Sequence, residues 1–242
     1  MGPEVPVTQI NLHHSKCASA ILARSMAAMQ TDIALIQEPW LLKDAIKGLS
    51  SCGKICYTHS NCKTRTYIAV KGLNVTFMPQ LSCEDLTVVQ IRLDFSMEVS
   101  LDVLVGSAYM PYDSEDLPFQ DEVKNLIAYA EKRGLELLLG CNANSHHALG
   151  EGVWASTPGE RAYTIHYEHQ PHDSQQRYRI YQDSRRQKVI DITLCMERVA
   201  GLVTNWIVSN EPSGSDHRFA YLSVTYRYIN ERDIRGEPIG KA

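Results

Sequence analysis

The stretch GCNANSHH, residues 140–147, directly follows the apolar run LELLL at residues 135–139. The apolar run has the length and composition of a buried strand, and it stops at a glycine, after which amides and imidazoles follow. Binding and catalytic residues are often placed where a rigid element ends and the chain reaches solvent. The stretch therefore predicts a sheet whose strand ends carry a functional site.

The composition is that of an ordinary globular protein. The chain has 242 residues, of which 44% are apolar and 21% charged, enough for one domain with a full core. Its net charge of −4 argues against the broad basic surface of many nucleic-acid binders, although SRRQK at residues 184–188 is a local basic patch. No run approaches the ~18 apolar residues of a membrane helix, so we expect no membrane association.

The cysteines indicate a reducing environment. There are seven, an odd number, and no secretory signal is recognisable, so we expect reduced thiols in an intracellular protein. Cys52, Cys56 and Cys62 are loosely spaced. A zinc site there is a weak alternative, because paired CxxC motifs and histidine ligands are missing.

The hydrophobic periodicity predicts one α+β domain over residues 1–228, with two packed sheets and helices outside. Two stretches have helical spacing, at residues 18–30 and 119–134. The predicted strands lie at residues 7–12, 32–39, 66–72, 86–93, 101–111, 135–141, 188–195, 201–210 and 219–228. The polar residues 229–242 are expected to form a loose tail.

Residues 150–182 do not fit this pattern. They are rich in His, Gln, Tyr and Arg and have little apolar periodicity, so no regular structure is predicted for them. A structureless segment of this length is unusual inside a compact domain. Three interpretations stay open: a surface loop, a functional loop, or a segment damaged by a compensated frameshift in a decaying gene.

One event recurs along the chain: a buried strand ends and a polar group follows. Each case alone has an ordinary structural explanation, such as a turn or a solvated strand end. Asp191 is harder to explain in this way, because a carboxylate between Ile190 and Ile192 needs a partner if it is buried. The polar residues at these strand ends are Asn11, Glu38, Tyr109, Asn142, Asn144, Asp191, Asp216 and His217.

Such a set is suited to phosphodiester hydrolysis. A hard cation such as Mg²⁺ prefers carboxylate oxygen and neutralises phosphate charge, and Glu38 and Asp216 could hold it. A histidine can bind phosphate or move a proton while a carboxylate fixes its tautomer, as Asp191 and His217 could do. Amide and phenol donors hold phosphate oxygens without adding negative charge.

The motifs QIN, QEP, SAYMP, GCNAN, VIDITL and SDHR occur in this order between about residues 8 and 224. In this order they resemble the endonuclease/exonuclease/phosphatase superfamily, and more closely the apurinic-type endonuclease domain of non-LTR retrotransposons. The resemblance implies a four-layer α/β sandwich: two mostly antiparallel sheets packed face to face, with helices outside.

The resemblance also implies an activity and its residues. The expected activity is metal-dependent nicking of DNA, with Mg²⁺ or alternatively Mn²⁺, leaving a 3′-hydroxyl that primes reverse transcription. The expected partners of a monomeric chain are DNA and an attached or separate reverse transcriptase, which requires at least transient nuclear localisation. The implied metal residues are Asn11, Glu38 and Asp216, and the implied catalytic residues are Tyr109, Asn142, Asn144, Asp191, Asp216 and His217.

Two departures from the family pattern bear on activity. The family has aspartate where this chain has Asn142, and losing a general acid or base commonly lowers a rate by ~10²–10⁴. Residues 150–182 lack the Trp-Gly turn and the amphipathic helix usual in the family. Two alternatives therefore stay open: a catalytically silent DNA-binding remnant, and a phosphatase of the same superfamily.

Overall fold

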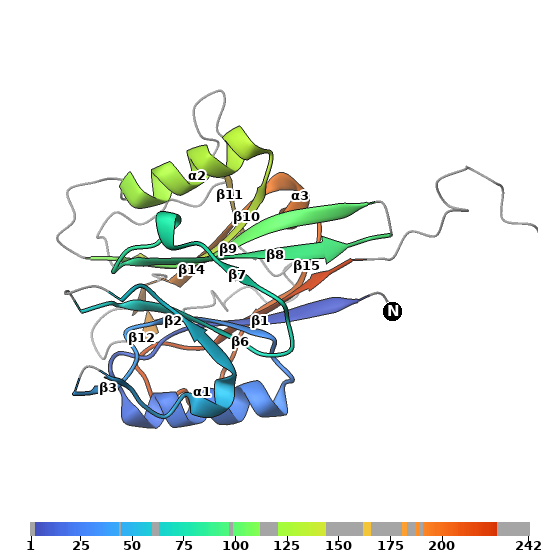
Figure 1. The fold of residues 1–242 in the computed structure, drawn as a ribbon. Helices are drawn as coiled ribbons and strands as arrows, with labels where there is room; N and C mark the ends of the chain where they lie inside the picture. Colours follow the sequence, from blue (N-terminus) through green and yellow to red (C-terminus); the bar gives the residue numbers. More distant parts are fainter. Residues whose placement is uncertain are drawn as a thin grey trace, which may run out of the picture.

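A computed structural model describes residues 3–43, 45–59, 63–96, 99–111, 121–143, 162–165, 181–182, 187–188 and 191–226. In this part of the chain two six-stranded sheets pack face to face, with helices on their outer faces (Figure 1). The predicted four-layer sandwich is thereby confirmed. Asn144 and the tail at 229–242 lie outside the described residues.

The first sheet joins the beginning and the end of the chain. Its central strands β1 and β2 are parallel, and β16 and β6 flank them in antiparallel orientation. The strand order is β15 (Val203–Val208), β16 (Ala220–Thr225), β1 (Glu4–Asn11), β2 (Ile33–Gln37), β6 (Thr66–Val70) and β5 (Lys54–Cys56).

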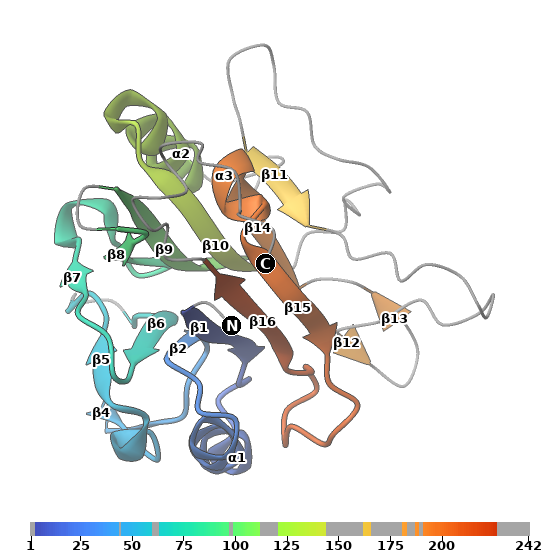
Figure 2. The same ribbon diagram turned by 90° about the vertical axis from the view of Figure 1, so that its right-hand side faces the viewer.

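The second sheet is built in the same way around a parallel pair, β9 and β10, with β14 and β8 antiparallel beside them (Figure 2). The strand order is β11 (Ala162–Ile165), β14 (Asp191–Met196), β10 (Glu136–Ala143), β9 (Ser100–Met110), β8 (Leu86–Asp94) and β7 (Thr76–Phe77). Both sheets therefore place the carboxyl ends of a central parallel pair at one edge.

Strand β2 shows why the layers form. All five of its residues are buried, because successive side chains point to opposite faces and both faces are covered. Ile33 and Leu35 lie in the core between the sheets, whereas Ala34 and Ile36 lie in the core beneath α1 (Lys16–Ala28). An apolar run without alternation is thus the expected pattern for a strand in a four-layer fold.

The second outer helix, α2 (Asp121–Arg133), begins with acidic and ends with basic residues, which complements the helix dipole. Gly134 follows with a φ of 64°, the left-handed conformation that commonly ends a helix. Four residues of α2 pack on the outer face of the second sheet: Val123, Leu126, Ile127 and Ala130.

Several elements differ from the sequence prediction. Strand β11 and the two residues of β12 (Tyr181–Gln182) lie inside residues 150–182, and β11 pairs with β14, so the expectation of no regular structure fails for these six residues. The four-residue helix α3 (Glu197–Ala200) follows β14 and is too short to show a helical period. Short strands and turns also occur at β3 (Leu41–Leu42), β4 (Ala45–Ile46), η1 (Ser50–Cys52), η2 (Pro79–Leu81), β12 (Tyr181–Gln182) and β13 (Gln187–Lys188).

Two further features of the described part concern its cysteines and its helices. The six cysteines described there form no disulfide with one another, and Cys52 and Cys56 are buried. Cys62 lies outside the described residues. None of the described helices combines the length and the apolar character needed to cross a lipid bilayer.

Candidate active site

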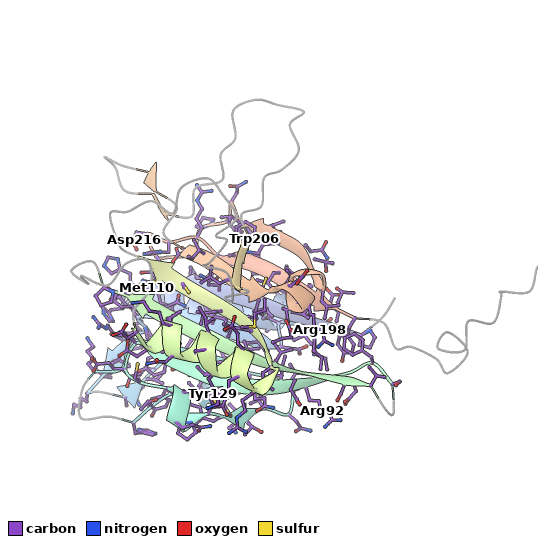
Figure 3. The ribbon with its side chains drawn as sticks, turned by 90° about the horizontal axis from the view of Figure 1, so that it is seen from above. Arg92, Met110, Tyr129, Arg198, Trp206 and Asp216 are labelled. Carbon is purple, nitrogen blue, oxygen red and sulfur yellow. The ribbon has the colours of Figure 1, made fainter. Side chains whose placement is uncertain are left out.

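The strand ends converge at one edge of the two sheets. Asn11 ends β1, and Asn142 lies near the end of β10, opposite Tyr109 of β9 and Asp191 of β14. Because β14 and β16 run antiparallel to their neighbours, Asp191 and the loop before β16 reach the same edge. Figure 3 shows Met110, the last residue of β9, and Asp216 at one end of the molecule, and Arg92 and Arg198 at the other.

Three side chains form what we call the buried half of the site: Asn142, Asp191 and His217. The Asn142 amide donates from Nδ2 to Asp191 Oδ1 at 2.6 Å, and His217 Nδ1 lies 2.5 Å from Asp191 Oδ2. Asn142 is 0%, Asp191 2% and His217 5% exposed. The carboxylate that the sequence leaves between two isoleucines thus has a partner on each oxygen, as burial requires.

The charges around His217 favour its protonated form. Burial alone lowers the pKa of this imidazole, but the charge and hydrogen bond of Asp191, followed by the charges of Asp216 and Glu38, raise the pKa above its ordinary value. Since Nδ1 faces a carboxylate, we assign it the proton. Nε2 then faces away from Asp191, 3.8 Å from Asp216 Oδ1.

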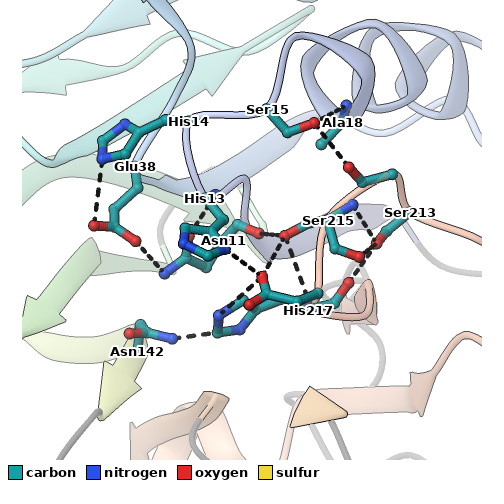
Figure 4. Close-up of polar contacts among 12 residues, drawn as sticks. Asn11, His13, His14, Ser15, Ala18, Glu38, Asn142, Ser213, Ser215 and His217 are labelled. Carbon is teal, nitrogen blue, oxygen red and sulfur yellow. Dashed lines mark hydrogen bonds and ion pairs between the residues drawn. The ribbon is translucent and has the colours of Figure 1, made fainter. Parts of the chain in front are cut away.

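Two further carboxylates, Glu38 and Asp216, form the open half of the site, with Asn11, His13 and His14 in contact with them. Figure 4 shows Glu38 with Asn11 and His14 beside it. Asn11 Nδ2 donates to Glu38 Oε2 at 3.0 Å, and its Oδ1 accepts from the His13 backbone at 2.8 Å. Asn11 therefore orients Glu38. His14 Nε2 lies 3.5 Å from Glu38 Oε1, and His13 Nδ1 lies 2.8 Å from Asp216 Oδ1.

The backbone of the open half is strained. Glu38, His13 and His14 have φ values of 45°, 44° and 54°, in the left-handed region that costs a non-glycine residue about 1–3 kcal/mol. Backbone hydrogen bonds hold this conformation, among them His14 N to Glu38 O at 2.7 Å. Such strain clusters at functional sites, which supports a functional reading of this edge.

The loop that carries Asp216 and His217 is fixed to the first sheet and to α1. Ser215 Oγ donates to the carbonyl of Asn11 at 2.8 Å and accepts from the His217 backbone at 3.2 Å. Gly214 has a φ of 73°, and a Cβ there would lie 3.0 Å from Ala18 N, so only glycine fits. These contacts explain why a polar turn just before β16 has a defined place in the site.

A glutamine between the sheets supports the buried half from below. Gln9 Nε2, from β1, donates to the carbonyls of Cys141 at 3.1 Å and Ile192 at 3.2 Å, the neighbours of Asn142 and Asp191. A Cβ on Gly140 would lie 2.8 Å from Gln9 Oε1. The glycine that ends the apolar run therefore makes room for the side chain that joins the sheets beneath the site.

Tyr109 stands beside Glu38. Burial raises the pKa of its phenol to about 12, and the charge of Glu38 and a hydrogen bond to it act in the same direction. The phenol is therefore a neutral hydrogen-bond donor at physiological pH.

The structure thus brings seven of the eight predicted site residues to one edge, and the eighth, Asn144, lies outside the described residues. Their catalytic and metal-binding roles stay predictions. Sequence reasoning missed Gln9, His13, His14 and the ion pair of Arg65 with Asp85. Only Gln9 gave a signal, because it opens the QIN motif that was quoted for Asn11.

The open half suits a cation that keeps part of its water shell. Glu38 and Asp216 offer hard oxygen donors and remain partly exposed. Among the described residues, no three His, Cys, Asp or Glu side chains converge as a ready-made metal cage. Mg²⁺ usually binds through one or two carboxylates together with waters and substrate phosphate, so the donor set fits Mg²⁺.

No protein-family model and no curated protein matches this sequence. Solved structures do match. The endonuclease domain of TRAS1, a telomere-specific non-LTR retrotransposon, is 24% identical with a TM-score of 0.72, covering 93% of this chain and all 100% of that domain. The AP endonuclease LMAP from Leishmania major is 10% identical with a TM-score of 0.67, covering 92% of this chain and 88% of its own.

A third match is an endonuclease/exonuclease/phosphatase family protein from Leptotrichia buccalis, 12% identical with a TM-score of 0.59, covering 92% of this chain and 100% of its own. The chain therefore has the endonuclease/exonuclease/phosphatase fold. The resemblance to a non-LTR retrotransposon endonuclease domain, predicted from the order of the motifs, is confirmed at the level of that fold.

Proposed function

We propose that this chain is a phosphodiester hydrolase that nicks DNA in the manner of a non-LTR retrotransposon endonuclease, with Mg²⁺ as its cofactor. One observation carries the proposal. Distant chain positions supply a single edge with two partly exposed carboxylates, Glu38 and Asp216, beside a buried pair, Asp191 and His217. The fold shared with the TRAS1 endonuclease domain supports it.

Each residue has a role that its geometry allows. Glu38 and Asp216 would hold Mg²⁺, which when bound neutralises charge on the scissile phosphate. His217 keeps Nδ1 on Asp191 and turns Nε2 toward the open side, where it can donate to a phosphate oxygen. The neutral phenol of Tyr109 is a second donor beside Glu38.

Asn142 limits this chemistry. Its amide donates to Asp191 and helps to fix the carboxylate, but an amide cannot serve as a general acid or a general base near neutral pH. The site therefore keeps its geometry and lacks one acid–base group, which predicts cleavage slower by ~10²–10⁴ than with aspartate. The proposed product carries a 3′-hydroxyl that would prime a reverse transcriptase on the same or a separate chain, in the nucleus.

Nicking of supercoiled plasmid tests the proposal. The native chain, Asn142→Asp and the double variant Asn142→Asp/His217→Gln are compared with Mg²⁺ and with EDTA. We expect Asn142→Asp to nick ~10²–10⁴ times faster than the native chain, EDTA to stop it, and the second substitution to remove the gain. A polymerase should extend the nick directly. An Asn142→Asp chain that folds but shows no Mg²⁺-dependent nicking would overturn the proposal.

The second candidate is a DNA-binding protein without cleavage, which the observation of an amide at residue 142 favours. It predicts binding that weakens steeply with salt and no nicking by either chain. A phosphatase of the same superfamily is tested by offering inositol phosphates and phosphorylated lipids to the Asn142→Asp chain in the same buffers. A phosphatase would release phosphate from these compounds and leave the plasmid intact, unlike either candidate.

A further inference from the structure

An ion pair bridges the two sheets at the edge that carries the site. Arg65 directly precedes β6 of the first sheet, and Asp85 directly precedes β8 of the second. Arg65 Nε donates to Asp85 Oδ1 at 2.5 Å, and its Nη2 donates to the other oxygen of the same carboxylate. Two parallel hydrogen bonds fix the plane of the guanidinium, which a single contact would leave free to rotate.

The fixed guanidinium lies over a predicted catalytic side chain. Arg65 Cζ lies 4.7 Å from the centroid of the Tyr109 ring. Backbone hydrogen bonds also link these residues to the site. Tyr109 N donates to Asp85 O at 2.9 Å, and Glu38 N donates to Arg65 O at 2.7 Å. Arg65 and Asp85 therefore contact the two residues, Glu38 and Tyr109, that meet where the halves of the site join.

A cation stacked on an aromatic ring is attracted to the face of the ring, so a movement of the ring away from the guanidinium loses this contact. The phenol oxygen lies on the long axis of the ring, so it stays beside Glu38 only while the whole ring keeps its place against Arg65, and Asp85 prevents the arginine from leaving. A lysine at residue 65 would supply the charge without the planar fork, so it could neither bind both Asp85 oxygens nor stack in the same way.

We propose that Arg65, clamped by Asp85, is a positioning residue that holds the Tyr109 ring with its phenol directed at the Glu38 carboxylate and the phosphate position beside it. The role of the Tyr109 phenol in cleavage rests on the proposed function. The positioning itself does not, and it is testable without cleavage.

The first experiment observes Tyr109 directly. Fluorotyrosine is placed at residue 109 and followed by fluorine NMR in the otherwise native chain and in Arg65→Met and Arg65→Lys. The control is Arg92→Met, which removes an exposed arginine whose Nε lies 3.0 Å from Asp94 Oδ1 on the protein surface. We expect both Arg65 variants to shift and broaden the fluorine resonance, and Arg92→Met to leave it in place.

An unchanged resonance in a folded Arg65→Met chain overturns the positioning. If that variant does not fold, Asp85→Asn replaces it. This variant keeps the arginine and loses one acceptor of the fork, so the resonance should shift in the same direction by a smaller amount. An unchanged resonance in Asp85→Asn would equally overturn the proposal.

The second experiment places the Arg65 variants in the Asn142→Asp chain and measures steady-state nicking. A displaced phenol should lower kcat by about 10- to 100-fold and change KM less than about twofold for both Arg65→Met and Arg65→Lys, because orientation is lost and binding is not. A raised KM with unchanged kcat overturns the role in the reaction. An Asn142→Asp chain that never cleaves overturns the proposed function, while the fluorine result still decides the positioning.

Discussion

The two halves of the site treat the same chemical group in opposite ways. Asp191 in the buried half is 2% exposed and has a donor on each carboxylate oxygen. The Asp216 side chain in the open half is 30% exposed, and its histidine neighbour His13 is 59% exposed. A buried charge needs partners to exist at all, whereas an exposed one is stabilised by water and can exchange its contacts. The buried half therefore provides geometry and the open half provides a place for exchangeable ligands.

Removing one carboxylate from each half should produce the largest difference. Asp191→Ala leaves the His217 imidazole and the Asn142 amide buried without their acceptor, and breaking such a pair typically costs about 3–5 kcal/mol. Asp216→Ala should change the free energy of unfolding by about 0.5 kcal/mol or less, as at most surface positions. Urea denaturation of the metal-free variants measures both values. Equal losses would show that the halves are not energetically distinct.

Part of the difference between the two halves could be predicted from the sequence. The two isoleucine neighbours of Asp191 indicated that its carboxylate needs a partner if it is buried, and the structure shows it buried. Two packed sheets with helices outside followed from many predicted strands and two predicted helices, whereas the four-layer sandwich was implied by the family resemblance. What could not be predicted depends on backbone conformation and distant packing. The contacts of His13 and His14 with carboxylates arise from left-handed φ values, and nothing local pairs Arg65 with Asp85 twenty residues later.

Segment 150–182 shows the same limit from another side. Strand β11 forms within it because β14 offers an unpaired edge, and a strand that joins an existing sheet needs little periodicity of its own. The helix α3 is a single turn, too short for any hydrophobic period to reveal. Elements formed by their surroundings are thus the ones that the sequence did not predict.

The next effect concerns residue 142 within the buried half. Asn142→Asp places a second carboxylate oxygen about where Nδ2 now lies, 2.6 Å from Asp191 Oδ1. Two buried carboxylates in contact cannot both ionise, so one pKa must rise. We expect a loss of about 1–3 kcal/mol in the free energy of unfolding at pH 8 in EDTA, shrinking as the pH falls and the pair takes up a proton.

Urea titrations at pH 5 and pH 8 measure this difference, and Glu38→Asp in the open half is the control that keeps the charge. A loss of stability that grows toward acid would contradict the contact between the carboxylates. Together with the expected gain in nicking rate, the result would show that the native amide makes the buried half more stable and less reactive.

His217 gives the buried half a pH dependence. Its folded pKa is raised above the ordinary 6.5, so its contribution to stability is fully present below pH 6.5 and is lost as the pH rises through the folded pKa. The difference in unfolding free energy between the native chain and His217→Gln should therefore be largest in acid and shrink with rising pH, by about 1.4 kcal/mol for each unit of elevation. NMR titration of the imidazole locates the folded pKa, and a difference that widens with pH would refute the coupling to Asp191.

The smallest effects belong to the histidines of the open half. His13→Ala and His14→Ala each remove one contact, and such exposed pairs are typically worth about 0.2–1 kcal/mol, which is about 1.4- to fivefold in an equilibrium constant. If these side chains compete with Mg²⁺ for Asp216 and Glu38, each variant of the Asn142→Asp chain should reach half-maximal nicking at about 1.4- to fivefold lower Mg²⁺. Nicking measured across a magnesium series checks this. A higher magnesium requirement would instead show that the histidines help to hold Mg²⁺. The open half would then have fixed ligands, as the buried half has fixed hydrogen-bond partners.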